Sequence, residues 1–298
     1  MALIYRPARV EELARAEQLV ATSINDLTVR HGFGRMASTR PPHFQAFSLK
    51  EDPDGLWVAE EGGDILGFAF SWVCGSLWFL SELFVAPDQQ GRGIGNELLS
   101  RTMAHAKKAG TSEKALITFA FNRVSQGLYI RHGLFPRLPL NLFSIKREAL
   151  RARKHESGLE AAAITTSDLP ALAAIDVHAL GLSREKHHLY IIGESDLRGI
   201  LFREGGASIG YAYISPEGHV GPLAVRQPAA MGAVFTAALE RASKMGSAQI
   251  SALIPGSAEA ALGVAVALGM RIAFPLVLMS SADFGDWRCY LPRNPGFM

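Results

Sequence analysis

Three glycines stand between an apolar strand pattern and a helical pattern in the first half of the chain. The apolar run 83–85 stops before Pro87, and Gly91, Gly93 and Gly95 follow just ahead of the helix. Because glycine has no side chain, a ligand can lie directly against backbone N–H groups in such a turn. The N–H groups at a helix N-terminus also favour an anion. The spacing therefore predicts a phosphate-binding turn.

Two familiar phosphate loops fit this turn poorly. A Walker-type loop requires a Lys-Ser/Thr pair after its last glycine, and Asn96-Glu97 stands there instead. A dinucleotide-binding fingerprint requires the first strand–helix unit and a ribose-binding acid about 20 residues on. A glycine turn that merely caps the helix is the structural alternative.

The elements around the turn follow a mixed α/β order. Apolar runs predict strands, and apolar residues three or four apart predict helices. The expected strands are 2–6, 56–60, 65–74, 77–85, 115–120 and 140–145, and the expected helices are 10–22, 23–29, 92–109 and 123–132. The remainder of 23–47, together with 136–140, is expected to form loops on the acceptor side, and the charged stretch 146–156 an exposed connector.

The second half of the chain repeats this order. Strands are expected at 161–164, 199–203, 208–214, 220–225, 249–254 and 272–279, and helices at 167–179, 229–242 and 259–268, with a helical or loop segment at 189–192. The glycine pairs Gly62-Gly63 and Gly205-Gly206 mark matching hairpin turns. Two copies of one unit are the economical reading, with domains at 1–150 and 158–298.

Bulk composition bounds the class of protein. The 298 residues are 48% hydrophobic and 19% charged, with a net charge of +2. This near-neutral balance gives no reason to expect nucleic acid or an anionic membrane as partner. No apolar run reaches the roughly 18 residues of a spanning helix, and the N-terminus lacks a signal-peptide core. The expectation is a soluble cytoplasmic protein whose two cysteines, Cys74 and Cys289, are reduced and bind no metal.

Two sequence elements together resemble the GNAT (GCN5-related N-acetyltransferase) superfamily. The run Gln90–Gly95 matches the family's Q/R-x-x-G-x-G/A motif between its fourth strand and third helix. A second motif follows at the expected separation, with Leu134 in place of the usual Phe; it comprises Asn122, Ser125, Leu128, Tyr129, Gly133 and Leu134. The first half carries this resemblance well and the second more weakly. The chain thus resembles a tandem protein whose domains are mostly antiparallel sheets with splayed central strands flanked by helices.

The resemblance implies an acetyl-CoA site. The pyrophosphate would be held by Gln90, Gly91, Arg92, Gly93, Ile94 and Gly95, and the pantetheine arm would pair with the backbone of Leu83, Phe84 and Val85. The Val85 N–H is then the expected donor to the thioester carbonyl. Asn122 and Ser125 would contact the pantetheine arm or its loop, although Asn122 could equally serve as a helix N-cap. No metal is implied.

The resemblance also implies an acid and a base. Tyr129 matches the family's general acid, and a phenol with a pKa of about 10 stays protonated at neutral pH. Glu82, just before the 83–85 run, is the candidate base, or a contact for a cationic amine. His31 and His43 lie in the acceptor-side loop region and are expected to be surface residues. The adjacent pair His187-His188 lacks partner ligands and is expected at the surface too.

The second copy departs from the pattern. Aligning Val225 with Val85 puts Ala230, Ala233 and Phe235 where the first copy has Gln90, Gly93 and Gly95, and Ala265 falls in the place of Tyr129. A degenerate, non-catalytic domain is expected, which could buttress the first, line the acceptor site or form a homodimer surface.

The expected activity is direct acetyl transfer to a primary amine, a small molecule or alternatively a protein N-terminus or lysine. A non-catalytic acyl-CoA-binding sensor or scaffold is the rival.

Overall fold

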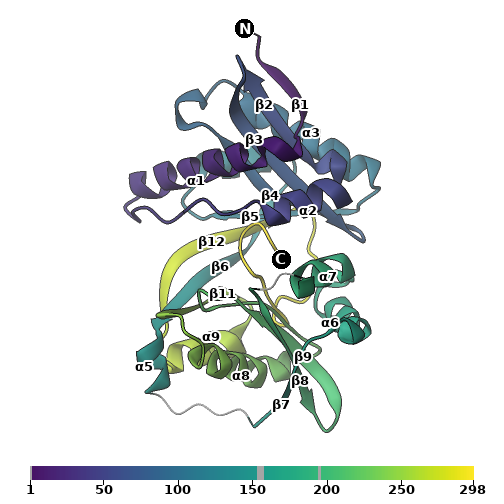
Figure 1. Ribbon diagram of the computed structural model, residues 1–298, viewed down its shortest axis with the longest axis vertical. Coiled ribbons are helices and arrows are strands. Elements are labelled where there is room, and N and C mark those ends of the chain that lie inside the picture. The colour runs from purple at the N-terminus through teal and green to yellow at the C-terminus, as the bar shows by residue number, and fades with distance from the viewer. Residues whose placement is uncertain (1, 153–157, 194–195) are drawn as a thin grey trace. The chain divides into compact units, whose positions relative to one another are not determined.

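A computed structural model describes residues 2–152, 158–193 and 196–298. The chain forms two compact units, each described by itself (Figure 1). The first unit consists of Met1–Ile117, Phe121–Phe135 and Ser280–Ala282, and the second of Thr118–Ala120, Pro136–Met279 and Asp283–Met298.

Among its described residues, the first unit has strands that lie side by side in their chain order. They are β1 (Ile4–Pro7), β2 (Leu56–Glu61), β3 (Asp64–Cys74), β4 (Leu77–Val85) and β5 (Glu113–Phe119). All neighbours are antiparallel except β4 and β5, which are parallel. The helices are α1 (Leu13–Arg30), α2 (His43–Glu51), α3 (Ile94–Lys108) and α4 (Arg123–Arg131). Figure 1 shows α1 in front of β3 and β4.

Helix α3 packs closely on the first sheet. Ile94 and Leu98 are buried against Ala59 and Ala69 of the sheet. A Cβ atom placed on Gly67 of β3 would lie 2.8 Å from Leu98 Cδ1, so glycine there permits the close approach. This packing fixes the N-terminus of α3 beside the end of β4.

The second unit carries the remaining strands. They are β6 (Phe135–Lys146), β7 (Glu160–Ala163), β8 (Arg198–Glu204), β9 (Ala207–Ile214), β10 (His219–Val225), β11 (Gln249–Pro255), β12 (Arg271–Ser280) and β13 (Tyr290–Leu291). The order is β12-β6-β11-β10-β9-β8-β7, with β13 beside β10.

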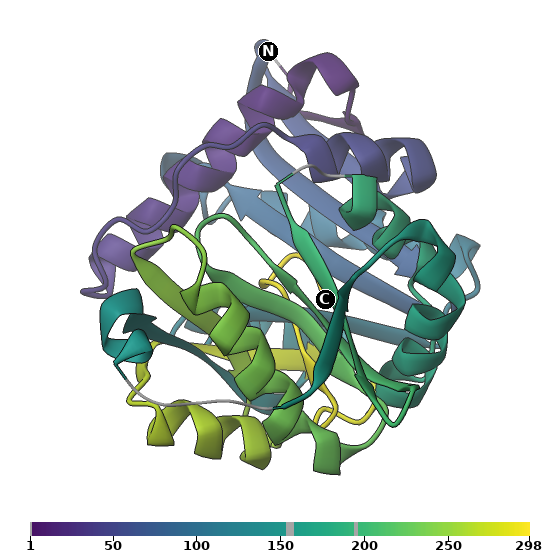
Figure 2. The ribbon, with the colours of Figure 1, turned by 60° about the horizontal axis from the view of Figure 1, so that its bottom comes forward.

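The helices in the described part of the second unit are α5 (Arg147–Arg151), α6 (Leu169–Leu180), α7 (Glu185–Gly193), α8 (Met231–Ser243) and α9 (Glu259–Ala267). Helices α6 and α8 both pack on β9 and β10, and α9 packs on α8. Figure 2 shows α8 crossing in front of this unit's strands.

The strand that ends the first half of the sequence belongs to the second unit. After α4, β6 pairs antiparallel with β11, from Leu140 opposite Pro255 to Lys146 opposite Gln249. Conversely, Ser281 near the end of the chain exchanges two hydrogen bonds with Lys114 of the first unit, at 2.9 and 3.0 Å. The units are therefore not two uninterrupted stretches of sequence. The assignment of catalysis to 1–150 and of a non-catalytic role to 158–298 stays a prediction.

Several expected elements differ from the structure. Residues 13–30 form one continuous helix rather than two pieces, and α2 lies inside the expected loop 23–47. Strand β6 begins at Phe135, so the expected loop 136–140 is strand, and α5 occupies part of the expected connector. The rest of that connector, 153–157, lies outside the described residues.

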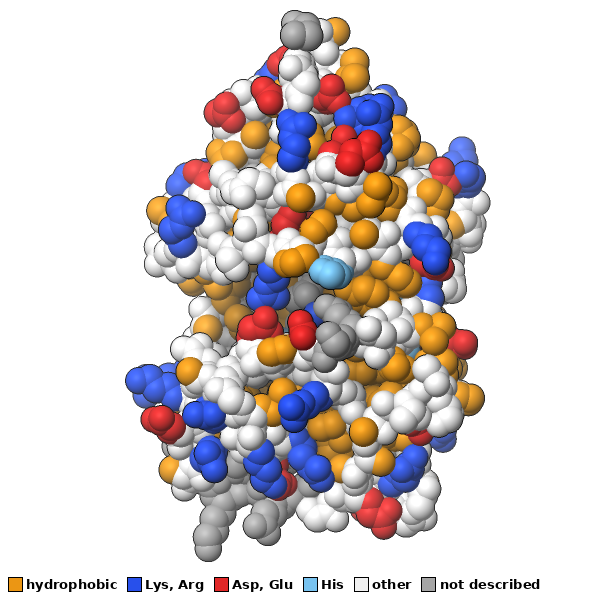
Figure 3. Space-filling model, in the orientation of Figure 1, with side chains coloured by type: hydrophobic (Ala, Val, Ile, Leu, Met, Phe, Trp, Pro, Cys, Tyr) orange, Lys and Arg blue, Asp and Glu red, His pale blue; other side chains and the backbone are white. Residues whose placement is uncertain are grey.

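Charged side chains of both signs are interspersed on the face drawn in Figure 3. Among the described residues, none of the helices has the length and hydropathy that a bilayer-spanning segment requires.

Candidate active site

Strands β4 and β5 separate halfway along their length. Their parallel pairing runs only from Leu77 opposite Glu113 to Leu80 opposite Leu116. At the same point β4 contains a bulge, because Phe70 of β3 lies opposite Glu82 whereas Ser71 lies opposite Leu80. A bulge bends the strand that carries the extra residue. The predicted splay is therefore present, and the backbone of β4 beyond Leu80 leaves its parallel neighbour.

The backbone of Val85 faces this opening. Its carbonyl oxygen accepts hydrogen bonds from Ser23 Oγ and Gln90 Nε2, both at 3.2 Å, while the next N–H, of Ala86, donates to Leu66 at 2.9 Å. In an antiparallel strand the N–H and C=O of one residue point to the same side. The Val85 N–H therefore points away from β3.

The glycine turn leads directly into α3. Gly93 is the N-cap of this helix with φ +82°, and Gly91 has φ +86°. A Cβ on either glycine would meet nothing within 4 Å, so the space in front of the turn is open. The first N–H groups of a helix have no intrahelical acceptors and lie at its positive end. The turn is thus shaped to hold an anion.

Arg92 lies in the turn but is already paired. Its two Nη atoms each lie 3.1 Å from the Glu61 carboxylate, and Nη1 lies 2.5 Å from Gln89 Oε1. The pair is solvent-exposed, so its net energy is small. Arg92 can strengthen anion binding only to the extent that it leaves Glu61.

Helix α4 begins with a chain of polar contacts. Asn122 Oδ1 accepts the Ser125 backbone N–H at 3.2 Å, and Asn122 Nδ2 donates to Ser125 Oγ at 2.8 Å. Asn122 is therefore a helix N-cap, as its structural reading suggested. Tyr129 is buried one turn later, and burial raises the pKa of its hydroxyl, opposed by a side-chain hydrogen bond with Ser125. The second motif is thus one connected group.

Glu82 lies at the bulge beside a second carboxyl group, that of Glu17, which belongs to no sequence motif. Gln45 Nε2 lies 3.2 Å from Glu82 Oε1 and also 3.2 Å from Glu17 Oε2. The other oxygen, Glu82 Oε2, is buried and has no hydrogen-bond partner among the described residues. Helices α1 and α2 bring Glu17 and Gln45 to β4, so this cluster exists only in the folded chain.

The environment of Glu82 weakens its acidity. Burial, followed by the charge of Glu17, raises the pKa of Glu82 to about 8, against the opposing hydrogen bond from Gln45. Burial likewise raises the pKa of Glu17, opposed by the Arg40 N–H at 3.4 Å. A carboxyl that gains and loses its proton near neutral pH is suited to general acid–base chemistry.

The acceptor-side loop is fixed to α1. Asn25 donates to Ala37 O at 2.8 Å and accepts the N–H groups of Met36 and Ala37 at 2.8 and 2.9 Å. His31 and His43 are exposed. In the described part of the chain, no three His, Cys, Asp or Glu side chains form a group suited to metal binding.

The histidine pair of the second unit does not lie at the surface as expected. His187 and His188 are each 1% exposed. His188 lies 2.9 Å from Asp176 and 3.0 Å from the Tyr213 hydroxyl. Partners distant in sequence make this burial tolerable, and sequence spacing alone does not show them.

Comparison with known proteins points to one family. Residues 22–134 match the acetyltransferase (GNAT) family. An uncharacterized N-acetyltransferase of Methanocaldococcus jannaschii is 36% identical over 95 residues, which are 28% of this chain and 41% of that protein. The uncharacterized N-acetyltransferase YhfO of Bacillus subtilis is 34% identical over 91 residues, which are 28% of this chain and 61% of that protein. The chain thus matches only part of each of these relatives.

Solved structures share the fold of the whole chain. A putative acetyltransferase from Pyrococcus horikoshii covers 99% of this chain and 96% of its own, with a TM-score of 0.79 and 15% identity. A tandem GNAT protein from the clavulanic acid biosynthesis pathway covers 94% of this chain and 98% of its own, with a TM-score of 0.62 and 16% identity. At these identities the likeness concerns the fold alone.

The raised pKa of Glu82 predicts a pH-dependent cost to stability. Burial favours the neutral form of the Glu82 carboxyl. The stability that this form contributes is therefore complete below 4.5, the pKa of Glu82 in the unfolded chain, and is lost as pH rises toward about 8. Glu82→Gln should therefore gain free energy of unfolding over the wild type between about pH 5 and about pH 8, by up to about 4 kcal/mol. Urea unfolding at several pH values measures this difference. The matched variant Glu51→Gln, at an exposed position of α2, should show none. A Glu82→Gln difference independent of pH would contradict the assignment.

Proposed function

Because residues 22–134 match the acetyltransferase (GNAT) family, we propose that the protein is an acetyl-CoA-dependent N-acetyltransferase. It transfers the acetyl group directly to a primary amine in a ternary complex. One observation supports the proposal: a strand edge that has left its parallel neighbour, a glycine turn at a helix N-terminus and a carboxyl of raised pKa occur together along β4.

The open backbone fits an acyl-CoA ligand. Backbone N–H groups of Gly91–Gly95 would bind the pyrophosphate, since nothing lies within 4 Å of a Cβ on Gly91 or Gly93. The backbone of Leu83–Val85 would pair with the pantetheine arm like an added strand. The Val85 N–H, which points away from β3, would then donate to the thioester oxygen as negative charge develops on it.

Glu82 would take the proton from the acceptor. An amine enters mainly as its ammonium ion and must lose a proton before it attacks. The unpartnered Oε2 of Glu82 can accept an ammonium N–H, and the charge of nearby Glu17 keeps this carboxyl basic. Two carboxyl groups in one cluster also favour a cationic acceptor over a neutral or anionic one.

Tyr129 would give a proton to the departing thiolate. Ser125 Oγ accepts from Asn122, so its own proton can be donated to the Tyr129 oxygen. The Tyr129 proton is then free for the leaving group. Its high pKa keeps the hydroxyl protonated throughout the physiological range. A ping-pong route is disfavoured because Cys74 is buried opposite Leu77, away from the bulge, and Cys289 lies in the second unit.

A small primary amine is the proposed acceptor, and a peptide N-terminus is the alternative. The small-amine proposal rests on the half-buried carboxyl pair of Glu17 and Glu82, which suits a compact cation. Turnover on a panel that contains both classes separates them.

Gly93→Ala should weaken acetyl-CoA binding about tenfold or more. The new methyl would project into the open space before the turn, and φ +82° is unfavourable for alanine. Gly63→Ala is the matched control, because this glycine has φ +91° and open space but lies in the β2–β3 turn. Titration calorimetry with acetyl-CoA measures both. Equal loss of affinity in the two variants would argue against phosphate binding at Gly93.

Tyr129→Phe should lower kcat by about 10²-fold or more while acetyl-CoA affinity stays nearly unchanged, because only the proton donor is removed. The assay is CoA thiol release over a panel of primary amines. Tyr190→Phe in α7 serves as control. Unchanged turnover in Tyr129→Phe would exclude it as the acid, and wild-type binding without turnover on any amine would favour a sensor.

Glu17→Gln should move the rising limb of the kcat/KM profile to lower pH by about one unit, because the charge that raises the pKa of Glu82 is gone. Glu82→Gln should abolish that limb. Profiles of both variants, beside Glu51→Gln, test the pair. An unmoved limb in Glu17→Gln would show that Glu17 does not act on the base.

A further inference from the structure

The second unit retains the strand opening of the first. Strand β10 pairs parallel with β11 only at His219–Ser251 and Val220–Ala252. Its pairing with β9 shifts register between Val220 and Leu223, just where β4 has its bulge when Val225 is aligned with Val85. The same alignment puts Pro222 in the place of Glu82, so the opening persists without the carboxyl.

A strand from the end of the chain fills this opening. Strand β13 pairs antiparallel with β10, with Leu291 opposite Leu223 and Tyr290 opposite Ala224. Since β9 occupies the other edge of β10, β13 lies on the edge that has left β11. The Val225 N–H donates to the Cys289 carbonyl at 3.0 Å. The counterpart of the Val85 N–H is therefore bonded to the protein's own backbone.

The bulge of β10 is also shaped around this segment. A Cβ atom on Gly221 would lie 2.7 Å from Pro292 O and 3.1 Å from Arg293 Cα. Both contacts are with backbone, which cannot turn aside as a flexible side chain can. Only glycine lets the segment approach β10 so closely.

A buried arginine anchors the segment at two points. Arg184 donates to the backbone oxygen of Met298, and its guanidinium lies 4.9 Å from the centre of the Tyr290 ring. The same guanidinium bonds the Asp176 carboxylate at 3.1 and 3.2 Å and the Tyr211 hydroxyl at 2.6 Å. Arg184 is 1% exposed and Asp176 0%.

Stability alone does not explain this buried network, because a buried ion pair seldom stabilises a fold more than apolar packing would. His188 adds a further bond to Asp176 at 2.9 Å, so the carboxylate is held from several sides. The guanidinium that it orients is the group that reaches the chain end. Holding that segment accounts for the charges.

We propose that the second unit is a peptide-binding cleft whose occupant is Cys289–Met298 of the same chain. The segment lies where the first unit would bind the pantetheine arm, and Arg184 is its anchor. Only the naming of pantetheine rests on the proposed function; the strand pairing and the anchor stand without it. The second unit then binds no acyl-CoA, because its opening is filled and Ala233 and Phe235 stand where the first unit has Gly93 and Gly95.

The two cysteines make the segment's release measurable. Cys289 belongs to the segment and is 2% exposed, while Cys74 belongs to the first unit and is 5% exposed. Burial raises the pKa of the Cys289 thiol to about 11. Release of the segment exposes Cys289 alone, whereas unfolding of the whole chain exposes both.

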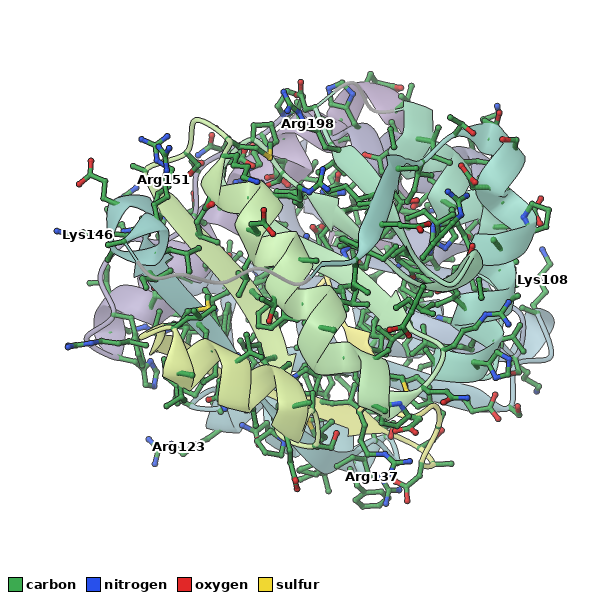
Figure 4. All side chains as sticks on the ribbon, turned by 90° about the horizontal axis from the view of Figure 1, so that it is seen from below. Lys108, Arg123, Arg137, Lys146, Arg151 and Arg198 are labelled. Carbon is green, nitrogen blue, oxygen red and sulfur yellow. The ribbon has the colours of Figure 1, made fainter. Side chains whose placement is uncertain are left out.

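The test is the rate at which each cysteine of the full chain reacts with a thiol reagent, resolved by peptide mass analysis. Arg184→Met and Gly221→Ala should each speed reaction at Cys289 at least tenfold and leave Cys74 unchanged. The control Arg198→Met, at an exposed position of β8 labelled in Figure 4, should change neither. Unchanged Cys289 rates in both variants would overturn the proposal, as would equal acceleration at both cysteines in both.

A second arm uses the wild-type protein with saturating CoA. The proposal predicts no change at Cys289, because the segment is a permanent occupant. Acceleration at Cys289 would show that CoA displaces the segment and would overturn the proposal. Neither arm requires acetyl transfer, so failure of the proposed function would be seen separately.

Discussion

A parallel strand pair that separates halfway along its length leaves backbone N–H and C=O groups on its inner edges without strand partners. Buried backbone groups must find other partners. This constraint arises at both bulged strands, β4 in the first unit and β10 in the second. In the first unit the N–H of Val85 faces the opening and suits a ligand with a peptide-like arm. In the second, the N–H of Val225 is bonded to Cys289. The two units therefore differ in what their open strand edge can bind: a ligand in the first unit, and the chain's own segment in the second.

The residues around β4 and around β10 differ in the same sense. Around β4 there is a helix N-terminus capped by glycine and a carboxyl whose pKa is raised to about 8. Around β10, Pro222 replaces that carboxyl, and Phe235 is fully buried in α8 where the first unit has Gly95. In the second unit, Arg184 is paired with Asp176 and donates to the backbone oxygen of Met298. The two repeats therefore differ in their proposed function because their polar groups lie at different places around the opening.

The sequence predicted what local spacing controls. The turn at Gln90–Gly95 and the group from Asn122 to Tyr129 are short motifs. In the structure the turn leads into α3, and Asn122 caps α4. Glu17 and Gln45 could not be selected, because they meet Glu82 only after α1 and α2 fold onto β4, and the apolar pattern of α2 is weak. The partner of β6 and the strand β13 escaped notice for a similar reason: pairing across the chain leaves no local signal. His187 and His188 read as surface residues because Asp176 and Tyr213 are distant in sequence.

Taken together, the two proposals leave the opening at β4 for a ligand and close the opening at β10 with the segment Cys289–Met298. Equilibrium binding of acetyl-CoA to the 298-residue chain distinguishes these outcomes, by titration calorimetry with protein of known concentration. We expect one molecule to bind per chain. Two molecules per chain would show that the second opening is also a ligand site, and no binding would show that the first is not one.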